Sequence, residues 1–231
     1  MSPTQSTASK KLTAAQRAVN NTLADAEIKA LVAAYGYNDA KLAEGSRLAQ
    51  AAEAAIIAKG EAAGAYRAAI ETFKTTKAEA AKAYQSLSTV ARAAANPAVL
   101  TGLGLDAPMP RQTDDFIKAG LRLFGSTTSL AALAEYGYDK TRLAAERAKI
   151  SAFQAASEGQ SSAKGAAQQA TSEQDAAIQA LNKWTAQYIK IAKVALSNTQ
   201  LLEKLGVTVR SGPTAAQRAA RKKTTPAAPT S

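Results

Sequence analysis

The sequence predicts an all-α protein: a tandem duplication of a helical unit of about 100 residues, with long coiled-coil-like helices packed as an elongated helical bundle. Three observations predict this fold. Alanine supplies 58 of the 231 residues, and Ala, Leu, Lys, Gln, Glu and Arg, all strong helix formers, dominate the chain. Two short motifs recur in the same order. Apolar residues also recur at spacings of three and four over long stretches.

The recurring motifs divide the chain into two copies. Tyr-Gly-Tyr at residues 35–37 returns at 136–138, and Leu-Gly-Leu at 103–105 is matched by Leu-Gly-Val at 205–207. Agreement of separate marks in one order indicates two diverged repeats. The expected division is a flexible basic arm (1–11), repeat 1 (12–105), a proline-rich connector (106–112), repeat 2 (113–210) and a disordered basic tail (211–231).

Each Tyr-Gly-Tyr motif predicts a corner between two helices. The glycine suits a helix end because it adopts the left-handed conformation without steric cost. The tyrosines are expected in the core, and an Asn or Asp that follows can cap the next helix. The corner residues are Tyr35, Gly36 and Tyr37, then Tyr136, Gly137 and Tyr138. By the same reasoning Gly104 and Gly206 are helix stops.

A long helical pattern follows each corner. In the first copy the apolar spacing runs from Ile56 to Ala91 without a phase break, and the second copy has a small, polar stretch from Ser157 to Asp175. One continuous helix from Asp39 to Ala95 is favoured. The alternative is a hairpin in each copy, near Gly60 or Gly64 in the first and near Gly159 or Gly165 in the second.

The region between the copies contains three prolines and two glycines from Asn96 to Arg111, so it cannot continue a helix. The next helix begins at Thr113 and carries the densest apolar cluster of the chain. This cluster could hold the two halves together or contact a second chain. The residues expected to serve packing or self-association are Phe116, Ile117, Leu121, Phe124, Trp184 and Tyr188.

The net charge of +11 is concentrated at the ends of the chain. The eight basic residues there are Lys10, Lys11, Arg17, Arg210, Arg218, Arg221, Lys222 and Lys223, whereas the remainder holds 21 basic and 18 acidic residues. These eight are candidate contacts for nucleic acid or another polyanion. Basic tails also serve solubility or attraction to membrane surfaces.

The composition excludes much catalytic chemistry. The chain has no His and no Cys, which removes Ser-His-Asp triads, thiol nucleophiles, zinc fingers and iron–sulfur clusters. It has no glycine-rich phosphate loop either, so we expect no enzyme, cofactor, metal site or small-molecule substrate. A polar start and the lack of a long apolar run predict a cytoplasmic protein with no transmembrane segment, although a protein exported by a non-classical route would look the same.

The order of these motifs, ending in the Leu-Gly-Val-Thr-Val-Arg-Ser of residues 205–211, resembles a family of uncharacterised bacterial proteins built from two helical repeats. The resemblance covers roughly residues 23–211 and implies architecture, with no function. We therefore expect a structural or scaffolding protein that self-associates into a dimer or higher assembly. One alternative is an architectural nucleic-acid-binding protein that uses its basic ends. Another is an amphipathic pore-forming or membrane-surface protein.

Overall fold

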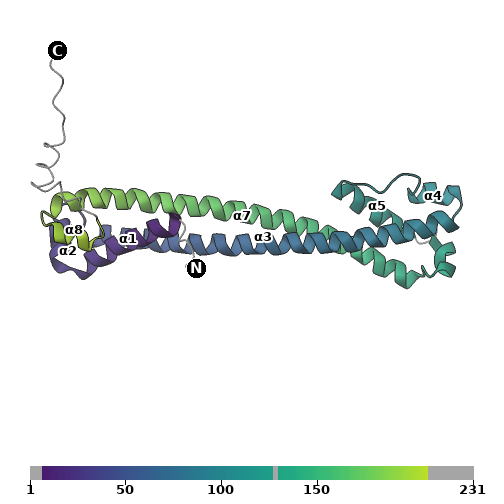
Figure 1. The fold of residues 1–231 in the computed structure, drawn as a ribbon, viewed down its shortest axis with the longest axis horizontal. Coiled ribbons are helices and arrows are strands. Elements are labelled where there is room, and N and C mark those ends of the chain that lie inside the picture. Colours follow the sequence, from purple (N-terminus) through teal and green to yellow (C-terminus); the bar gives the residue numbers. More distant parts are fainter. Residues whose placement is uncertain (1–6, 127–129, 208–231) are drawn as a thin grey trace, which may run out of the picture. The chain divides into compact units, whose positions relative to one another are not determined.

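The computed structural model describes residues 7–126 and 130–207, and all regular structure in these residues is helical, which confirms the all-α prediction. The elements are α1 (Thr7–Ala24), α2 (Ala26–Ala33), α3 (Asp39–Ala94), α4 (Pro97–Leu103), α5 (Thr113–Gly125), the 3-10 helix η1 (Ala131–Tyr136), α7 (Lys140–Ala195) and α8 (Thr199–Lys204) (Figure 1).

The tandem duplication is visible in the order of these elements. The series α1, α2, α3, α4 returns as α5, η1, α7, α8, and the two long helices α3 and α7 both have 56 residues. Their first residues, Asp39 and Lys140, are 101 positions apart, which is the offset of the Tyr-Gly-Tyr motifs. Residues 101 positions apart are therefore equivalent from the first helix to the end of the long helix of each repeat, and the closing glycines Gly104 and Gly206 are 102 positions apart.

Each long pattern forms one helix, so the hairpin alternative is wrong. Gly60 and Gly64 lie inside α3, and Gly159 and Gly165 lie inside α7. A Cβ atom built on any of the four meets nothing within 4 Å. A glycine inside a helix costs only about 1 kcal/mol relative to alanine, and without a proline or turn sequence beside it the helix continues.

Four glycines take the left-handed conformation expected at helix ends. Their φ angles are +89° at Gly36, +71° at Gly104, +81° at Gly137 and +77° at Gly206. After each glycine the chain turns back on the finished helix: the N–H of Tyr37 donates to the carbonyl of Val32 at 3.1 Å. This is the Schellman arrangement, in which the residue after the glycine also makes an apolar contact with the helix.

The two tyrosines of each corner have different environments. Tyr37 and Tyr138, which follow the glycines, are buried at 6% and 3% exposure, whereas Tyr35 and Tyr136 are about half exposed. The expectation that all four lie in the core is therefore wrong for Tyr35 and Tyr136. Only the residue after the glycine is brought back against the helix by the Schellman turn, while the residue before it remains on the outside of the last turn.

A side-chain oxygen caps each long helix. Asn38 Oδ1 accepts the N–H of Lys41 at 3.1 Å, and Asp139 Oδ1 accepts the N–H of Arg142 at 2.8 Å. Asn38 rather than Asp39 is thus the cap of α3, and the Asp39 carboxylate instead pairs with Lys29 at 2.8 Å. These bonds satisfy N–H groups that have no partner within the helix.

Two predicted boundaries are corrected. Helix α1 begins at Thr7, inside the predicted flexible arm 1–11, because Leu12 is buried and Ala8 packs against the same apolar cluster. The short helix α4 occupies part of the stretch expected to be irregular. Asn96 caps it by accepting the N–H of Val99 at 2.9 Å, and Pro97 occupies the first turn, where its missing N–H costs nothing. The predicted tail 211–231 lies outside the described residues.

The chain divides into two compact units, and each is built from both repeats. Unit 1 comprises residues 1–56 with 173–231, and unit 2 comprises residues 57–172. Unit 1 therefore holds α1, α2 and the start of α3 from repeat 1, with the end of α7 and α8 from repeat 2. Unit 2 holds the remainder of the helices. The predicted repeats, 12–105 and 113–210, describe the duplication of the sequence. They do not coincide with the two compact units, because each unit contains part of both repeats.

The core of unit 1 joins the two repeats through an aromatic group. Trp184 and Tyr188 from α7 pack with Tyr37, and the Trp184 and Tyr188 rings are stacked with centroids 5.3 Å apart. A second cluster lies between α1, α3 and α7 and consists of Leu12, Ala15, Ala49, Ala52, Ile178 and Leu181. Both clusters contain residues of both repeats, so neither repeat alone completes this core.

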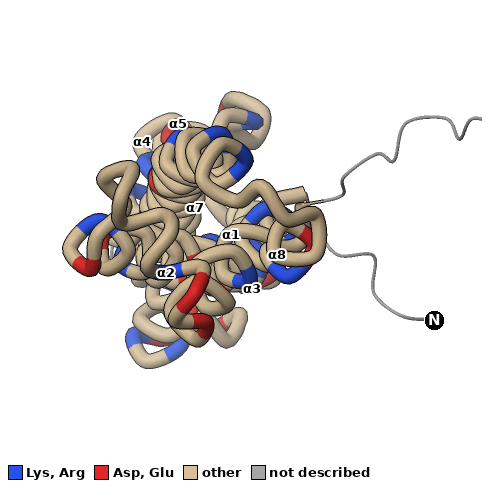
Figure 2. Tube along the Cα trace, turned by 90° about the vertical axis from the view of Figure 1, so that its left-hand side faces the viewer, with Lys and Arg blue, Asp and Glu red and all other residues tan. Residues whose placement is uncertain are grey.

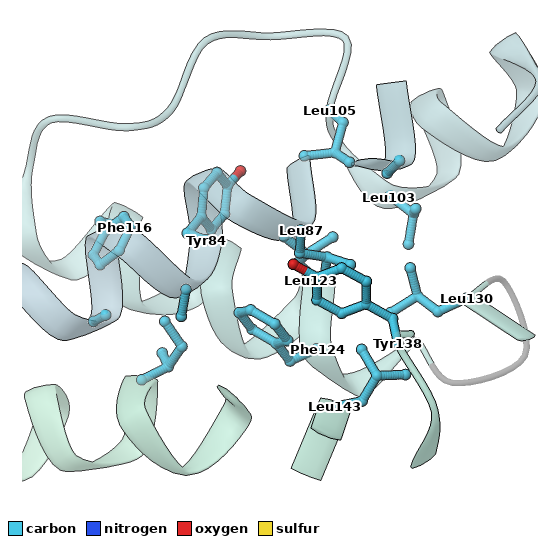
Figure 3. Close-up of a cluster of buried hydrophobic side chains, with 14 of the residues drawn as sticks. Tyr84, Leu87, Leu103, Leu105, Phe116, Leu123, Phe124, Leu130, Tyr138 and Leu143 are labelled. Carbon is cyan, nitrogen blue, oxygen red and sulfur yellow. The ribbon is translucent and has the colours of Figure 1, made fainter. Parts of the chain in front are cut away.

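The core of unit 2 is a larger cluster beneath α5 (Figure 3). Phe116 lies between Tyr84 of α3 and Phe153 of α7, with ring centroids 5.5 and 5.8 Å away. The same cluster continues away from Phe116 through Leu87, Leu123 and Phe124 to Leu130, Tyr138 and Leu143, with Leu103 and Leu105 at the side of α4.

Equivalent core positions of the two units have diverged. In unit 1 the hydroxyl groups of Thr22 and Tyr188 form a buried hydrogen bond. Their equivalents in unit 2 are Leu123 and Leu87, which are fully buried in one apolar cluster. A polar pair has been exchanged for an apolar pair as a whole, which avoids leaving one buried hydroxyl without a partner.

Two glycine substitutions are expected to have opposite effects on stability. Gly36→Ala places a Cβ at φ +89° and should lower the free energy of unfolding by about 1 kcal/mol. Gly60→Ala adds a methyl group in open space on a regular helix and should raise it by about 0.5–1 kcal/mol. Urea denaturation followed by circular dichroism measures both, and equal effects of the two substitutions would contradict the left-handed helix end at Gly36.

Candidate functional site

The residues expected to serve packing or self-association lie inside the chain. Phe116, Ile117 and Phe124 are buried in unit 2, with Leu121 partly buried against the same cluster. Trp184 and Tyr188 are buried in unit 1. Since each cluster contains both repeats, these side chains join the two repeats within the chain.

The polar side-chain groups in the core of unit 1 are buried and uncharged. Burial raises the pKa of the Tyr188 phenol, while its hydrogen bond with Thr22 acts in the opposite direction. Burial also raises the pKa of Tyr37. These phenols are therefore neutral at neutral pH, and the Trp184 Nε1 atom has no hydrogen-bond partner among the described residues. Nothing in this group supplies a charged or nucleophilic atom.

The basic residues near the N-terminus are exposed on α1. Lys10, Lys11 and Arg17 all point to solvent, and the Arg17 side chain passes close to Gly206, where a Cβ would meet its Cδ at 2.9 Å. Nearby, Lys204 pairs with Asp25 at 2.8 Å, which lowers the pKa of that carboxyl and attaches α8 to the start of α2. Figure 2 shows basic and acidic residues interspersed on the helices. The other predicted polyanion contacts, Arg210, Arg218, Arg221, Lys222 and Lys223, lie outside the described residues.

One section of unit 2 lacks the covering found elsewhere in that unit. We define the uncovered section as residues 57–72 of α3 and 154–169 of α7. None of its described residues is fully buried, and one face of each helix is half-buried, with Ala63, Tyr66 and Ile70 on α3 and Ala156, Ala163 and Ala167 on α7. Helix α5 borders the start of the α7 part, where Ser157 and Glu158 line a hollow together with Leu121. Elsewhere in the section, a helix with a single neighbour buries only one stripe, so the opposite face meets solvent.

The outward faces of the uncovered section are low in bulk and balanced in charge. Gly60, Gly64, Gly159 and Gly165 all have open space where a side chain would be, and Ile57 is 57% exposed. The charged residues are three bases and three acids: Lys59, Arg67, Lys164, Glu61, Glu71 and Glu158. This surface is therefore neutral, although the whole chain has a net charge of +11.

Sequence reasoning did not identify this section as a candidate site. The signal was the small, polar stretch from Ser157 to Asp175, where large apolar residues disappear from the helical pattern of the second copy. The sequence favours a continuous helix through this stretch, with a hairpin near Gly159 or Gly165 as the alternative. In the structure this stretch lies within α7, and its residues up to 169 include no fully buried side chain.

Other kinds of site are missing from the part of the chain that the structure describes. Within residues 7–126 and 130–207, no cluster of three or more acidic residues could hold a metal ion. In the same residues, no helix combines the length and the apolar character that crossing a membrane requires.

The fold defines the chain as an all-α protein of two tandem helical repeats with intertwined cores. Comparison of the chain with protein-family models, curated proteins and solved structures finds no match. The resemblance to a two-repeat bacterial family therefore stays an expectation, and the function has to be argued from the geometry.

Proposed function

We propose that the protein is a non-enzymatic structural protein that self-associates, and that the uncovered section forms the contact between copies. The observation that carries this proposal is the absence of any fully buried residue in residues 57–72 and 154–169. The neighbouring part of unit 2 has its helices covered by α4 and α5, with a closed apolar core (Figure 3).

A second copy of the chain suits this surface for two reasons. The balanced charge of the section lets two copies approach without the repulsion that a net charge of +11 would otherwise cause. The glycines and alanines allow helices to pack closely, as in four-helix arrangements. A face about 24 Å long and about 20 Å wide would bury about 1,000 Å² in total, the lower limit for a specific interface.

The test is the mass of the full-length protein in solution, measured by light scattering over a range of concentrations. We expect the native chain to form dimers or larger species at high concentration. The double variant Ala68→Glu, Ala166→Glu places like charges on exposed positions of the section. It should weaken association about tenfold or more, because like charges brought together at an interface cost several kcal/mol.

A matched control is Ala93→Glu, Ala144→Glu, which adds the same charges at exposed positions of α3 and α7 outside the section. This control should associate like the native chain. A monomer at every concentration, or an equal effect of the two double variants, would overturn the proposal. Association that appears only with added DNA and disappears with salt would instead support the nucleic-acid alternative.

A further inference from the structure

A small, partly open hollow in unit 2 is bordered by four segments of the chain. Its volume is 160 Å³, and it lies between α3, the irregular segment before α5, the start of α5 itself, and α7. The residues that matter for its chemistry are Lys77, Met109, Arg111, Thr113, Phe116 and Phe153. It is separate from the hollow lined by Asp114 and Glu158 on the other side of α5.

The walls of this hollow are apolar and aromatic. Phe116 and Phe153 are both buried, with ring centroids 5.8 Å apart, and Met109 and Pro110 complete the lining from the irregular segment. An apolar cavity of about 150 Å³ is known to accept a benzene molecule. The hollow therefore has room for a single aromatic ring.

The polar groups around the hollow are cationic. Lys77, Arg111 and Thr113 are among the lining residues, and no lining residue is acidic. Among the described residues no carboxylate forms an ion pair with Lys77 or Arg111. The Lys77 ammonium instead lies 5.8 Å from the centroid of the Phe73 ring. Two exposed basic residues thus line an apolar space, and neither forms an ion pair with a carboxylate of the described residues.

The equivalent place in unit 1 is filled. The counterparts of Thr113 and Lys77 are Leu12 and Ile178, which are both buried in one apolar cluster. Helix α1 extends five residues ahead of Leu12, whereas α5 begins at Thr113 and the chain before it is irregular. The counterpart of Arg111 is Lys10, which is also basic, so the two copies differ in charge at one of these positions: unit 1 has the buried Ile178 where unit 2 has Lys77.

We propose that this hollow binds a small organic anion with a flat apolar body, of the class of aromatic carboxylates. The ring would occupy the space between Met109, Phe116 and Phe153, and the carboxylate would meet Arg111 and Lys77. Arginine binds a carboxylate with two parallel hydrogen bonds, and charge-assisted bonds of this kind are about twice as strong as neutral ones. This inference does not depend on self-association.

The probe is benzoate, titrated into the full-length protein by calorimetry at low ionic strength. We expect saturable binding in the millimolar range or tighter, and at least tenfold weaker binding of acetate, which lacks the ring, and of benzyl alcohol, which lacks the charge. Lys77→Ile installs the residue found at the equivalent position of unit 1, and Arg111→Gln removes the second charge. Each should weaken benzoate binding about tenfold.

The matched control is Lys74→Gln, on the same helix, which removes a lysine that pairs with Glu71 and does not line the hollow. Circular dichroism checks that each variant is folded, and shifts of the Met109 methyl resonance report binding at the hollow itself. Unchanged binding in both Lys77→Ile and Arg111→Gln, equal binding of acetate or benzyl alcohol, or no saturable binding of benzoate would overturn the assignment.

Discussion

Trp184→Ala is expected to lower the free energy of unfolding by about 4 kcal/mol, the usual cost of removing a large buried aromatic side chain. Trp184 is 3% exposed, stacks on Tyr188 and lies edge-on to Tyr37. Its ring also occupies the space above Gly45, where a Cβ atom would lie 2.4 Å from the indole. Urea denaturation monitored by circular dichroism measures the loss.

The Trp184 ring can pack against α3 at this point because residue 45 is a glycine and has no side chain. Gly45→Leu should also be destabilising, by about 3 kcal/mol, because the new side chain and the indole cannot occupy one space. In the double variant Gly45→Leu, Trp184→Ala, the leucine refills part of the cavity, so the loss should be at least 1 kcal/mol smaller than the sum of the single losses. Additive losses would contradict the direct contact between the two positions. Gly60→Ala, with nothing near its Cβ, is the control for a new side chain on α3.

Separating the two repeats is expected to abolish folding of each one alone. Of the residues buried in the Trp184 cluster of unit 1, Ala18, Val19, Ile28, Val32, Tyr37 and Leu42 belong to repeat 1, and Trp184, Tyr188, Ala192, Leu196, Leu201, Leu202 and Leu205 belong to repeat 2. A chain of residues 1–105 therefore exposes one half of this core to water. Burying apolar surface is the dominant favourable contribution to folding, so the isolated repeat should lack a cooperative unfolding transition as a monomer.

Mixing the separate chains 1–105 and 106–231 tests whether the two repeats together restore the fold that each lacks alone. The two should restore the helical circular dichroism signal and form a one-to-one complex, because each unit takes elements from both chains. The matched control is the uncut protein. A cooperative monomeric transition in residues 1–105 alone would show that repeat 1 has a self-sufficient core and would contradict the intertwined arrangement.

Much of the fold could be predicted from short-range features of the sequence. The four left-handed glycines, the caps at Asn38 and Asp139 and the continuity of α3 all depend on residues within about one turn of each other. The start of α1 at Thr7 and the short helix α4 were missed. Tertiary packing of Ala8 and Leu12 stabilises the first, and the Asn96 cap with Pro97 stabilises the second inside a stretch that otherwise reads as irregular.

The candidate sites were less predictable than the fold. Phe116 and Trp184 were noticed because they are large and apolar, yet they are buried in the chain's own cores. The uncovered section was overlooked because its alanines, glycines and serines resemble any exposed helix. The hollow at Lys77 and Arg111 brings together residues 34 positions apart, which no local pattern relates.

The amino-acid order was sufficient for the two long helices, the four glycine helix ends and the duplication, because backbone conformation and capping depend on near neighbours in the chain. Which helix faces pack against each other depends on the tertiary structure. The end of α7 packs with Tyr37 and Val32 of the other repeat, and Phe116 packs between Tyr84 and Phe153, because these pairings remove the largest apolar side chains from water. The same packing left residues 57–72 and 154–169 without a fully buried side chain and formed the hollow beside Phe153.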